Sequence, residues 1–155
     1  MQKLSELHKN VLGYCQDDYT GLWLVVWVIT RDLVRQQPGG RELLDMVASK
    51  AWDAELGAQL EERELAIDQK LVREKVLQIL RDLLEAGLIE AGCPTEDGKW
   101  ESWSLSPADT MNRIQAEWEA LGHEPGLGDV AWFISTMEGD RVLSQGTERN
   151  VASEN

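Results

Sequence analysis

Long apolar runs are scarce in this chain, and so are the features of an exported protein. The longest apolar run, residues 22–29, is far shorter than the roughly 20 residues of a membrane-spanning helix. Residues 1–12 lack the apolar core and cleavage site of a signal peptide. These absences predict a cytoplasmic protein with no membrane partner.

Residues that commonly carry out chemistry are also few. Cys15 and Cys93 are isolated thiols, and neither His8 nor His123 has a Cys, His or carboxylate at metal-ligand spacing. The sequence contains no GxSxG, GxGxxG or phosphate-loop motif. We therefore expect no catalytic residues, no bound metal and no cofactor, so the chain is predicted not to be an enzyme.

Basic residues are outnumbered, and the imbalance is uneven along the chain. The 155 residues include 15 Lys and Arg against 28 Asp and Glu, for a net charge of −13. Residues 1–50 hold six of each sign, whereas residues 51–100 carry a net −6 and residues 101–155 a net −7. Such a field repels phosphate backbones and anionic lipid, and it attracts a basic partner. The alternative is that this charge only keeps the protein soluble.

Tryptophan is the exception among the aromatic residues, with seven copies against one Phe and two Tyr. Trp packs in protein cores, and it is also enriched at the centres of protein interfaces. We expect most of the seven in the core and one or two at the surface.

Apolar spacing in the first half predicts helices over residues 2–15, 20–37 and 41–52. The second of these should be the most buried element, because its first half is apolar on nearly every face, and Thr20 with the nearby Asp pair supplies capping groups. Residues 53–68 are helix-prone and acidic, and either a short solvated helix or a loop fits them.

The clearest helical stripe, residues 71–84, ends where Gly87 suits a left-handed cap. Short apolar segments on either side of a Pro-Thr-Glu-Asp-Gly turn then predict a β-hairpin at about 88–105. Ser106 and Pro107 predict the start of another helix, which ends at Gly122.

The remaining segments complete a single domain over residues 1–144. A strand is expected at about 129–135, followed by a helical turn at 137–143. Residues 145–155 lack apolar content and are predicted to be a disordered tail. The predicted fold class is mainly α with a small antiparallel β element, that is, α+β.

The order of these elements resembles the winged-helix pattern. The Leu-Leu-x-x-Gly-Leu-Ile phrase at 83–89 resembles the end of a recognition helix, and the Thr-x-x-Gly turn at 136–139 resembles the end of a wing. The resemblance implies a winged-helix-like core over about residues 40–143. The helix at 106–121 departs from it, because a compact wing has only a turn there.

The chain also resembles small acidic bacterial immunity proteins of contact-dependent inhibition and related polymorphic toxin systems. The phrase at 18–23, Asp-Tyr-Thr-Gly-Leu-Trp, carries this likeness, together with the Gly-Leu-Ile segment, 116–118 and 128–130. The resemblance implies that the protein neutralises a cognate toxin domain, usually a nuclease, inside the producing cell.

DNA binding by a winged-helix transcriptional regulator is the alternative, because such folds commonly bind DNA with the helix before the wing. That helix carries four basic residues against four acidic ones, so its polar side is nearly balanced. The predicted wing is acidic and would not neutralise phosphates. Nucleic acid is therefore disfavoured as a partner.

A surface that blocks a basic toxin needs acidic groups around a few large apolar anchors. Positions 100 and 103 point to opposite faces of an alternating strand, so at least one Trp could be exposed. The alternative is that one Trp packs beneath the helix at 106–121 and that the acidic residues are only solvated. The predicted partner-binding residues are Glu96, Asp97, Trp100, Glu101 and Trp103 in the hairpin, with Glu61 and Glu62 in the acidic segment.

Overall fold

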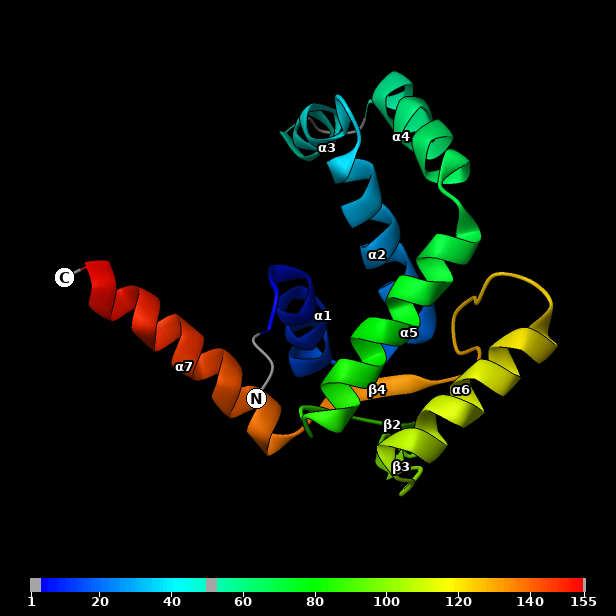
Figure 1. Ribbon diagram of the computed structural model, residues 1–155, viewed down its shortest axis with the longest axis vertical. Coiled ribbons are helices and arrows are strands. Elements are labelled where there is room, and N and C mark those ends of the chain that lie inside the picture. Colours follow the sequence, from blue (N-terminus) through cyan, green and yellow to red (C-terminus); the bar gives the residue numbers. More distant parts are fainter. Residues whose placement is uncertain (1–3, 50–52, 155) are drawn as a thin grey trace.

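The computed structural model describes residues 4–49 and 53–154, and Figure 1 shows a mostly helical molecule with a small sheet toward one end. This part of the chain is mainly α with one small antiparallel sheet, which confirms the predicted α+β class. In chain order the elements are α1 (Glu6–Asp17), β1 (Thr20–Gly21), α2 (Leu22–Gln36), α3 (Gly40–Ser49), α4 (Ala54–Ala66), α5 (Gln69–Glu85), β2 (Ile89–Pro94), β3 (Trp100–Ser102), α6 (Pro107–Leu121), β4 (Trp132–Ser135) and α7 (Met137–Glu154).

Polar side chains fix where several helices begin. Ser5, Asp53 and Asp68 each accept a backbone N–H in the first turn of α1, α4 and α5. Ser106 caps α6 in the same way, and Gly122 follows that helix with φ +73°. The predicted start and end of α6 are therefore confirmed.

The segment at 53–68 is a helix, α4. The Asp53 carboxylate accepts the N–H groups of Glu55 and Leu56 at 3.0 and 3.1 Å, and Leu56 and Leu60 are buried. The end of the preceding predicted helix, residues 50–52, lies outside the described residues.

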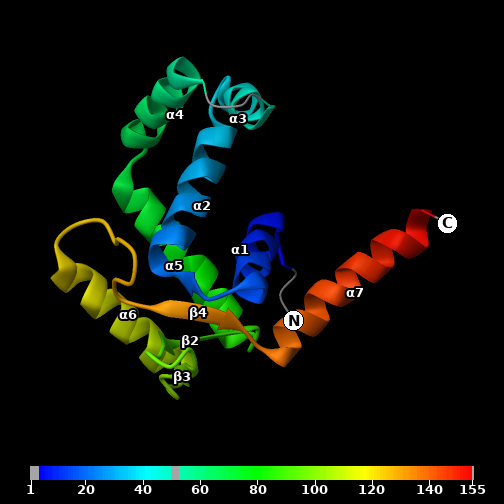
Figure 2. The same cartoon turned by 180° about the vertical axis from the view of Figure 1, so that it is seen from behind.

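The core lies where α2 packs against α5, and Figures 1 and 2 both show these two helices side by side. Val25, Ile29 and Val34 of α2 and Leu80 and Leu83 of α5 are among its fully buried side chains. Helix α2 is thus the central helix that the sequence predicts. It is not buried on every side, because Trp27 is 37% exposed.

The sheet has the order β1-β4-β2-β3, with each neighbouring pair antiparallel. Its first strand, β1, was not predicted from the sequence. Thr20 is buried in that strand opposite Phe133 instead of capping α2, which is preceded by Gly21 with no side-chain cap. The capping prediction for Thr20 was wrong, because strand pairing with a distant segment determines its conformation.

The hairpin prediction is confirmed by β2 and β3, which pair through Gly92 opposite Ser102 and Pro94 opposite Trp100. The last predicted strand, β4, pairs with the other edge of β2. Strand β3 and helix α6 come between β2 and β4 in the chain, so these two strands do not form a compact wing. The winged-helix likeness stays a prediction.

Helix α7 begins at a close contact with the sheet. The Thr136 hydroxyl accepts the Gly139 N–H at 3.1 Å, and a Cβ at Gly139 would lie 2.2 Å from the Leu88 carbonyl oxygen. The helix continues through Glu154, so it differs from the single turn and disordered tail that the composition predicted. Extending a helix costs less than starting one, so a capped start allows a polar continuation.

None of the helices in the described part of the chain is long and apolar enough to cross a membrane.

Candidate protein-binding site

The tip of the β2–β3 hairpin is held by Thr95. Its hydroxyl accepts the Lys99 N–H at 3.0 Å and also lies in contact with the Asp97 carboxylate, while its own N–H donates to the Lys99 carbonyl at 2.7 Å. Gly98 closes the turn with φ +80°, a conformation that suits glycine. The tip is therefore a tight turn with little conformational freedom.

An aromatic pair stands beside this turn. The rings of Tyr19 and Trp100 are stacked, with centroids 5.4 Å apart and planes inclined by 12°. The Trp100 indole N–H donates to a Glu90 carboxylate oxygen at 2.5 Å, and the Tyr19 hydroxyl donates to the Gly98 carbonyl at 3.3 Å. Both rings are half-buried, so they are held in place while part of each remains accessible.

Acidic side chains occupy the hairpin next to the pair, and Glu101, as the neighbour of Trp100 in β3, points to the other side of the strand. Glu96, Asp97 and Glu101 are exposed, and Lys99 is the one base between residues 95 and 101. The Lys99 Nζ lies 4.0 Å from Asp97, and both groups are largely solvated, so this pair contributes little to stability. We call Tyr19, Glu96, Asp97, Trp100 and Glu101 the hairpin face.

Trp103 does not belong to this face. It is half-buried and packs against the core, and the Arg113 guanidinium of α6 lies 3.8 Å from the centre of its ring. Arg113 also pairs with Glu117 at 3.4 Å. Trp103 is therefore the tryptophan that packs beneath α6, as one of the two alternatives from the sequence has it.

Glu61 and Glu62 are exposed, but they lie on α4, far from the hairpin. Figures 1 and 2 place α4 and β3 at opposite ends of the molecule, with α5 running between them. The predicted acidic residues thus form two separate surfaces.

Tyr19 was missed by sequence reasoning, although the phrase that contains it was singled out. The residue lies 79 positions from Gly98, and no local pattern indicates that contact. The alternation of residues 100 and 103 predicted opposite sides for the two Trp residues, without indicating which of them packs beneath α6.

A second polar network joins Ser5, His8 and Asp82. The Ser5 hydroxyl lies 2.6 Å from His8 Nδ1, and His8 Nε2 lies 2.9 Å from the Asp82 carboxylate. This is the order of a hydrolase triad, but the Ser5 oxygen caps α1 by accepting the His8 N–H, which favours a structural role. The network ties α1 to α5. In the described ranges, no group of three or more His, Cys, Asp or Glu residues could hold a metal ion.

Comparison with known proteins adds nothing to this geometry: no family model, no curated protein and no solved structure matches the chain. The hairpin face is consequently the candidate site on physical grounds alone.

Proposed function

We propose that this chain is an immunity protein, which binds and neutralises a cognate toxin domain with a basic surface in the cytoplasm of the producing cell. The observation that supports this most is the stacked pair of Tyr19 and Trp100, held by two hydrogen bonds, in a hairpin that carries exposed carboxylates. On this proposal the protein acts by binding, without a cofactor.

The hairpin face suits a partner rich in Lys and Arg. Carboxylates attract such a partner over several ångströms and speed encounter, and the aromatic faces can receive an arginine side chain. Because the Tyr19–Trp100 pair is already ordered, docking would cost little side-chain entropy. A nuclease domain has a basic substrate groove, and a protein with this charge would compete with nucleic acid for that groove.

The arrangement of α5 favours binding of a basic toxin domain over DNA recognition. Helix α5 packs against α2 and α6, and Arg73 is turned toward α6, with its guanidinium 5.3 Å from the Trp118 ring. Of its other charged residues, Lys70, Glu74 and Glu85 are exposed, whereas Lys75, Arg81 and Asp82 are half-buried. A recognition helix needs an open cationic face for the major groove, which this surface does not offer.

The test is a charge reversal on each of the two acidic surfaces. The partner is the C-terminal toxin domain that the proposal expects the neighbouring gene to encode, and its affinity for the chain is measured by calorimetry at low salt. We expect Glu96→Lys with Glu101→Lys to weaken binding by roughly tenfold or more, with loss of protection in cells. Raising the salt concentration should reduce the difference in affinity between this variant and the unaltered protein, because salt screens the electrostatic attraction.

Glu61→Lys with Glu62→Lys is the matched control, since it changes the net charge equally on α4. It should leave affinity within about twofold. Equal loss in both variants would mean that net charge, not the hairpin face, governs binding. No binding of the neighbouring toxin domain, together with retention of mixed DNA in a low-salt gel shift, would replace immunity with gene regulation.

A further inference from the structure

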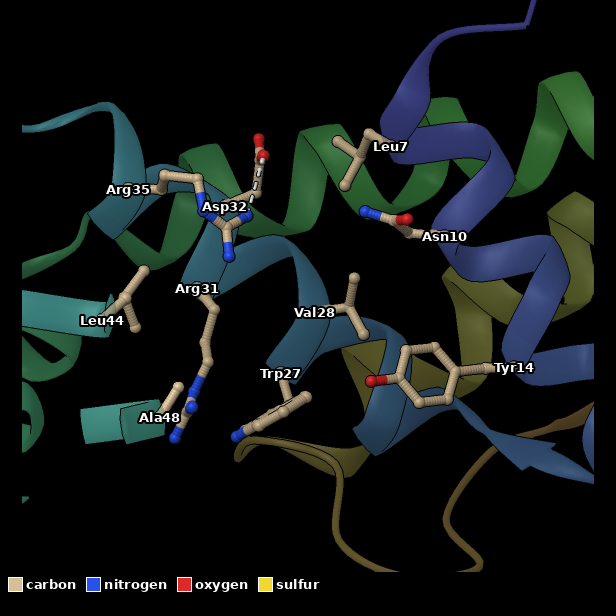
Figure 3. Close-up of a pocket in the computed structure, with 10 residues that line it drawn as sticks. All are labelled: Leu7, Asn10, Tyr14, Trp27, Val28, Arg31, Asp32, Arg35, Leu44 and Ala48. Atoms are coloured by element: carbon tan, nitrogen blue, oxygen red, sulfur yellow. Dashed lines mark ion pairs between the residues drawn. The ribbon is translucent and has the colours of Figure 1, made fainter. Parts of the chain in front are cut away.

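Three helices near the amino-terminal end enclose a groove of about 340 Å³. Figure 3 shows α2 as its floor, with Leu7 and Tyr14 reaching in from α1 on one side and Leu44 and Ala48 from α3 on the other. The groove lies away from the hairpin face, and none of its lining residues belongs to the predicted partner-binding set.

The lining residues follow helical spacing on the floor and on the α1 wall. On α2 they include Trp27, Arg31 and Arg35, each four residues from the next. Such a stripe runs along one side of a helix for about 12 Å, the length of roughly two turns.

The two walls repeat this pattern. Helix α1 presents Leu7, Asn10 and Tyr14 at intervals of three and four residues, and α3 presents Leu44 and Ala48 four residues apart. Residues at these intervals are the ones through which a helix packs against a neighbouring helix. The groove therefore has the form of a helix bundle from which one helix is missing.

The groove is lined by apolar and polar side chains together, and Arg31, Asp32 and Arg35 lie on its floor. Tyr14 and Trp27 are 41% and 37% exposed, which is unusual for side chains that gain so much from burial. Arg31 is held between the Trp27 ring, 4.3 Å from its guanidinium carbon, and Glu64, 3.2 Å from its Nε. Arg35 is 44% exposed, and its contact with Asp32 is long at 4.0 Å.

Arg35 is thus the cation available to a ligand. Its charge complements a carboxylate, and residues 1–50, which contain the three helices of the groove, carry no net charge.

We propose that the groove is a second docking site, and that it binds an amphipathic helix of a partner protein that carries a carboxylate beside its apolar stripe. The apolar stripe lies on Trp27 and Val28, between the α1 and α3 walls, and the carboxylate pairs with Arg35. This goes beyond the proposed immunity function, because the hairpin face selects a basic partner and the groove selects an acidic helix.

The α7 helix of a second copy is a poor occupant. Residues 144–154 contain only Val151 and Ala152 as apolar side chains, so they offer no stripe for Trp27 to cover. A second copy is nevertheless one outcome that the experiment distinguishes.

In the experiment, a library of displayed 16-residue helical peptides is selected for binding to the intact protein. Stripe positions vary among Leu, Phe, Met and Ala, and flanking positions vary among Glu, Gln and Lys. We expect enrichment of large apolar stripes with Glu on one flank. An enriched peptide, labelled with fluorescein, should lose roughly tenfold or more in affinity on Trp27→Ala and on Arg35→Glu, measured by fluorescence anisotropy.

Three controls make the outcome specific. Arg41→Glu makes the same charge change on α3 outside the groove and should alter affinity less than twofold. Changing the enriched Glu of the peptide to Lys should restore binding to Arg35→Glu, a result that survives even if Trp27→Ala misfolds. Glu96→Lys with Glu101→Lys should leave peptide binding unchanged, so the groove and the hairpin face are tested separately.

Two results would overturn the proposal of a helical acidic partner. One is selection of Lys-flanked peptides or of peptides indifferent to both groove variants. The other is a concentration-dependent dimer in light scattering that Trp27→Ala abolishes, because the occupant would then be a second copy of this chain.

Discussion

The hairpin face and the groove between α1, α2 and α3 use the same kinds of residue in opposite ways. In the hairpin face, aromatic rings are fixed by contacts within the chain, and the charges around them are acidic. In the groove, Tyr14 and Trp27 are substantially exposed, and Arg35 is a partly exposed cation. The net charge of −13 therefore agrees with the hairpin face but not with the groove, and we expect the two surfaces to select partners of opposite charge.

The hairpin face and the groove also differ in rigidity. Turn hydrogen bonds and strand pairing hold the hairpin face, so its shape exists before any partner arrives. The groove is defined only by the separation of three helices, and filling it would add packing contacts.

The largest expected effect is that of Gly92→Ala in β2. A Cβ there would lie 2.3 Å from the Glu101 carbonyl oxygen and 2.7 Å from the Trp100 ring, so β2 and β3 would have to separate. We expect the free energy of unfolding to fall by roughly 2–3 kcal/mol in urea denaturation. Peptide binding by the groove should persist at temperatures where the variant is folded. A fully stable Gly92→Ala variant would contradict the close strand pairing.

The second prediction concerns the pKa of the buried Cys15 thiol. Burial raises the pKa of Cys15 on α1 to about 12 from an ordinary value of 9.0, a shift that a hydrogen bond with Thr20 partly opposes. The unfolded chain loses this proton first, so above pH 9 the folded state is destabilised by up to about 1.4 kcal/mol per pH unit. This loss should disappear in Cys15→Ala, measured by urea denaturation between pH 8 and 10.5.

Thiol labelling compares Cys15 with Cys93. Cys93 is exposed on β2, so iodoacetamide should modify it in the native protein while Cys15 reacts only after unfolding. Mass spectrometry of the labelled peptides checks this result, and rapid native labelling of Cys15 would contradict its burial.

Thr95→Val removes the hydroxyl that holds the hairpin tip while keeping the side-chain shape. The Lys99 N–H would lose its acceptor at 3.0 Å, and we expect a loss of about 1 kcal/mol in stability. Toxin binding should weaken by several-fold, mainly through faster dissociation in surface plasmon resonance, because the tip is less ordered. Unchanged dissociation would mean that the partner does not contact this tip.

The smallest effect is that of Gly13→Ala, which is the same chemical change as Gly92→Ala but on α1. A Cβ at Gly13 would meet no atom within 4 Å, so alanine should stabilise the helix by about 0.5–1 kcal/mol. Thermal denaturation measures the gain. Groove affinity should be unchanged, since residue 13 does not line it.

Local patterns predicted much of the fold. The stripe of α5, the Ser106-Pro107 start and Gly122 end of α6, and the β2–β3 hairpin all depend on neighbours within a few positions, which the sequence displays directly. Strand β1 could not be predicted in this way. Only pairing with β4, more than 100 residues later, makes Thr20 and Gly21 a strand.

The same distinction between local patterns and long-range contacts applies to the two candidate sites. Acidic residues at the hairpin were visible because charge is a property of each residue alone. The stacking of Tyr19 on Trp100 and the exposure of Trp27 depend on how distant helices are placed. An apolar run such as that of α2 predicts a buried helix, but it does not indicate which side of the helix no other element covers.

The strand order has a consequence for synthesis on the ribosome. Because β4 lies between β1 and β2 and is encoded near residue 132, the two earlier strands have no shared neighbour until most of the chain has emerged. Non-local pairings of this kind form late. A nascent chain can thus assemble the helices that precede β4 early, but the edge that orients Tyr19 toward the hairpin is completed only after residues 132–135 have emerged.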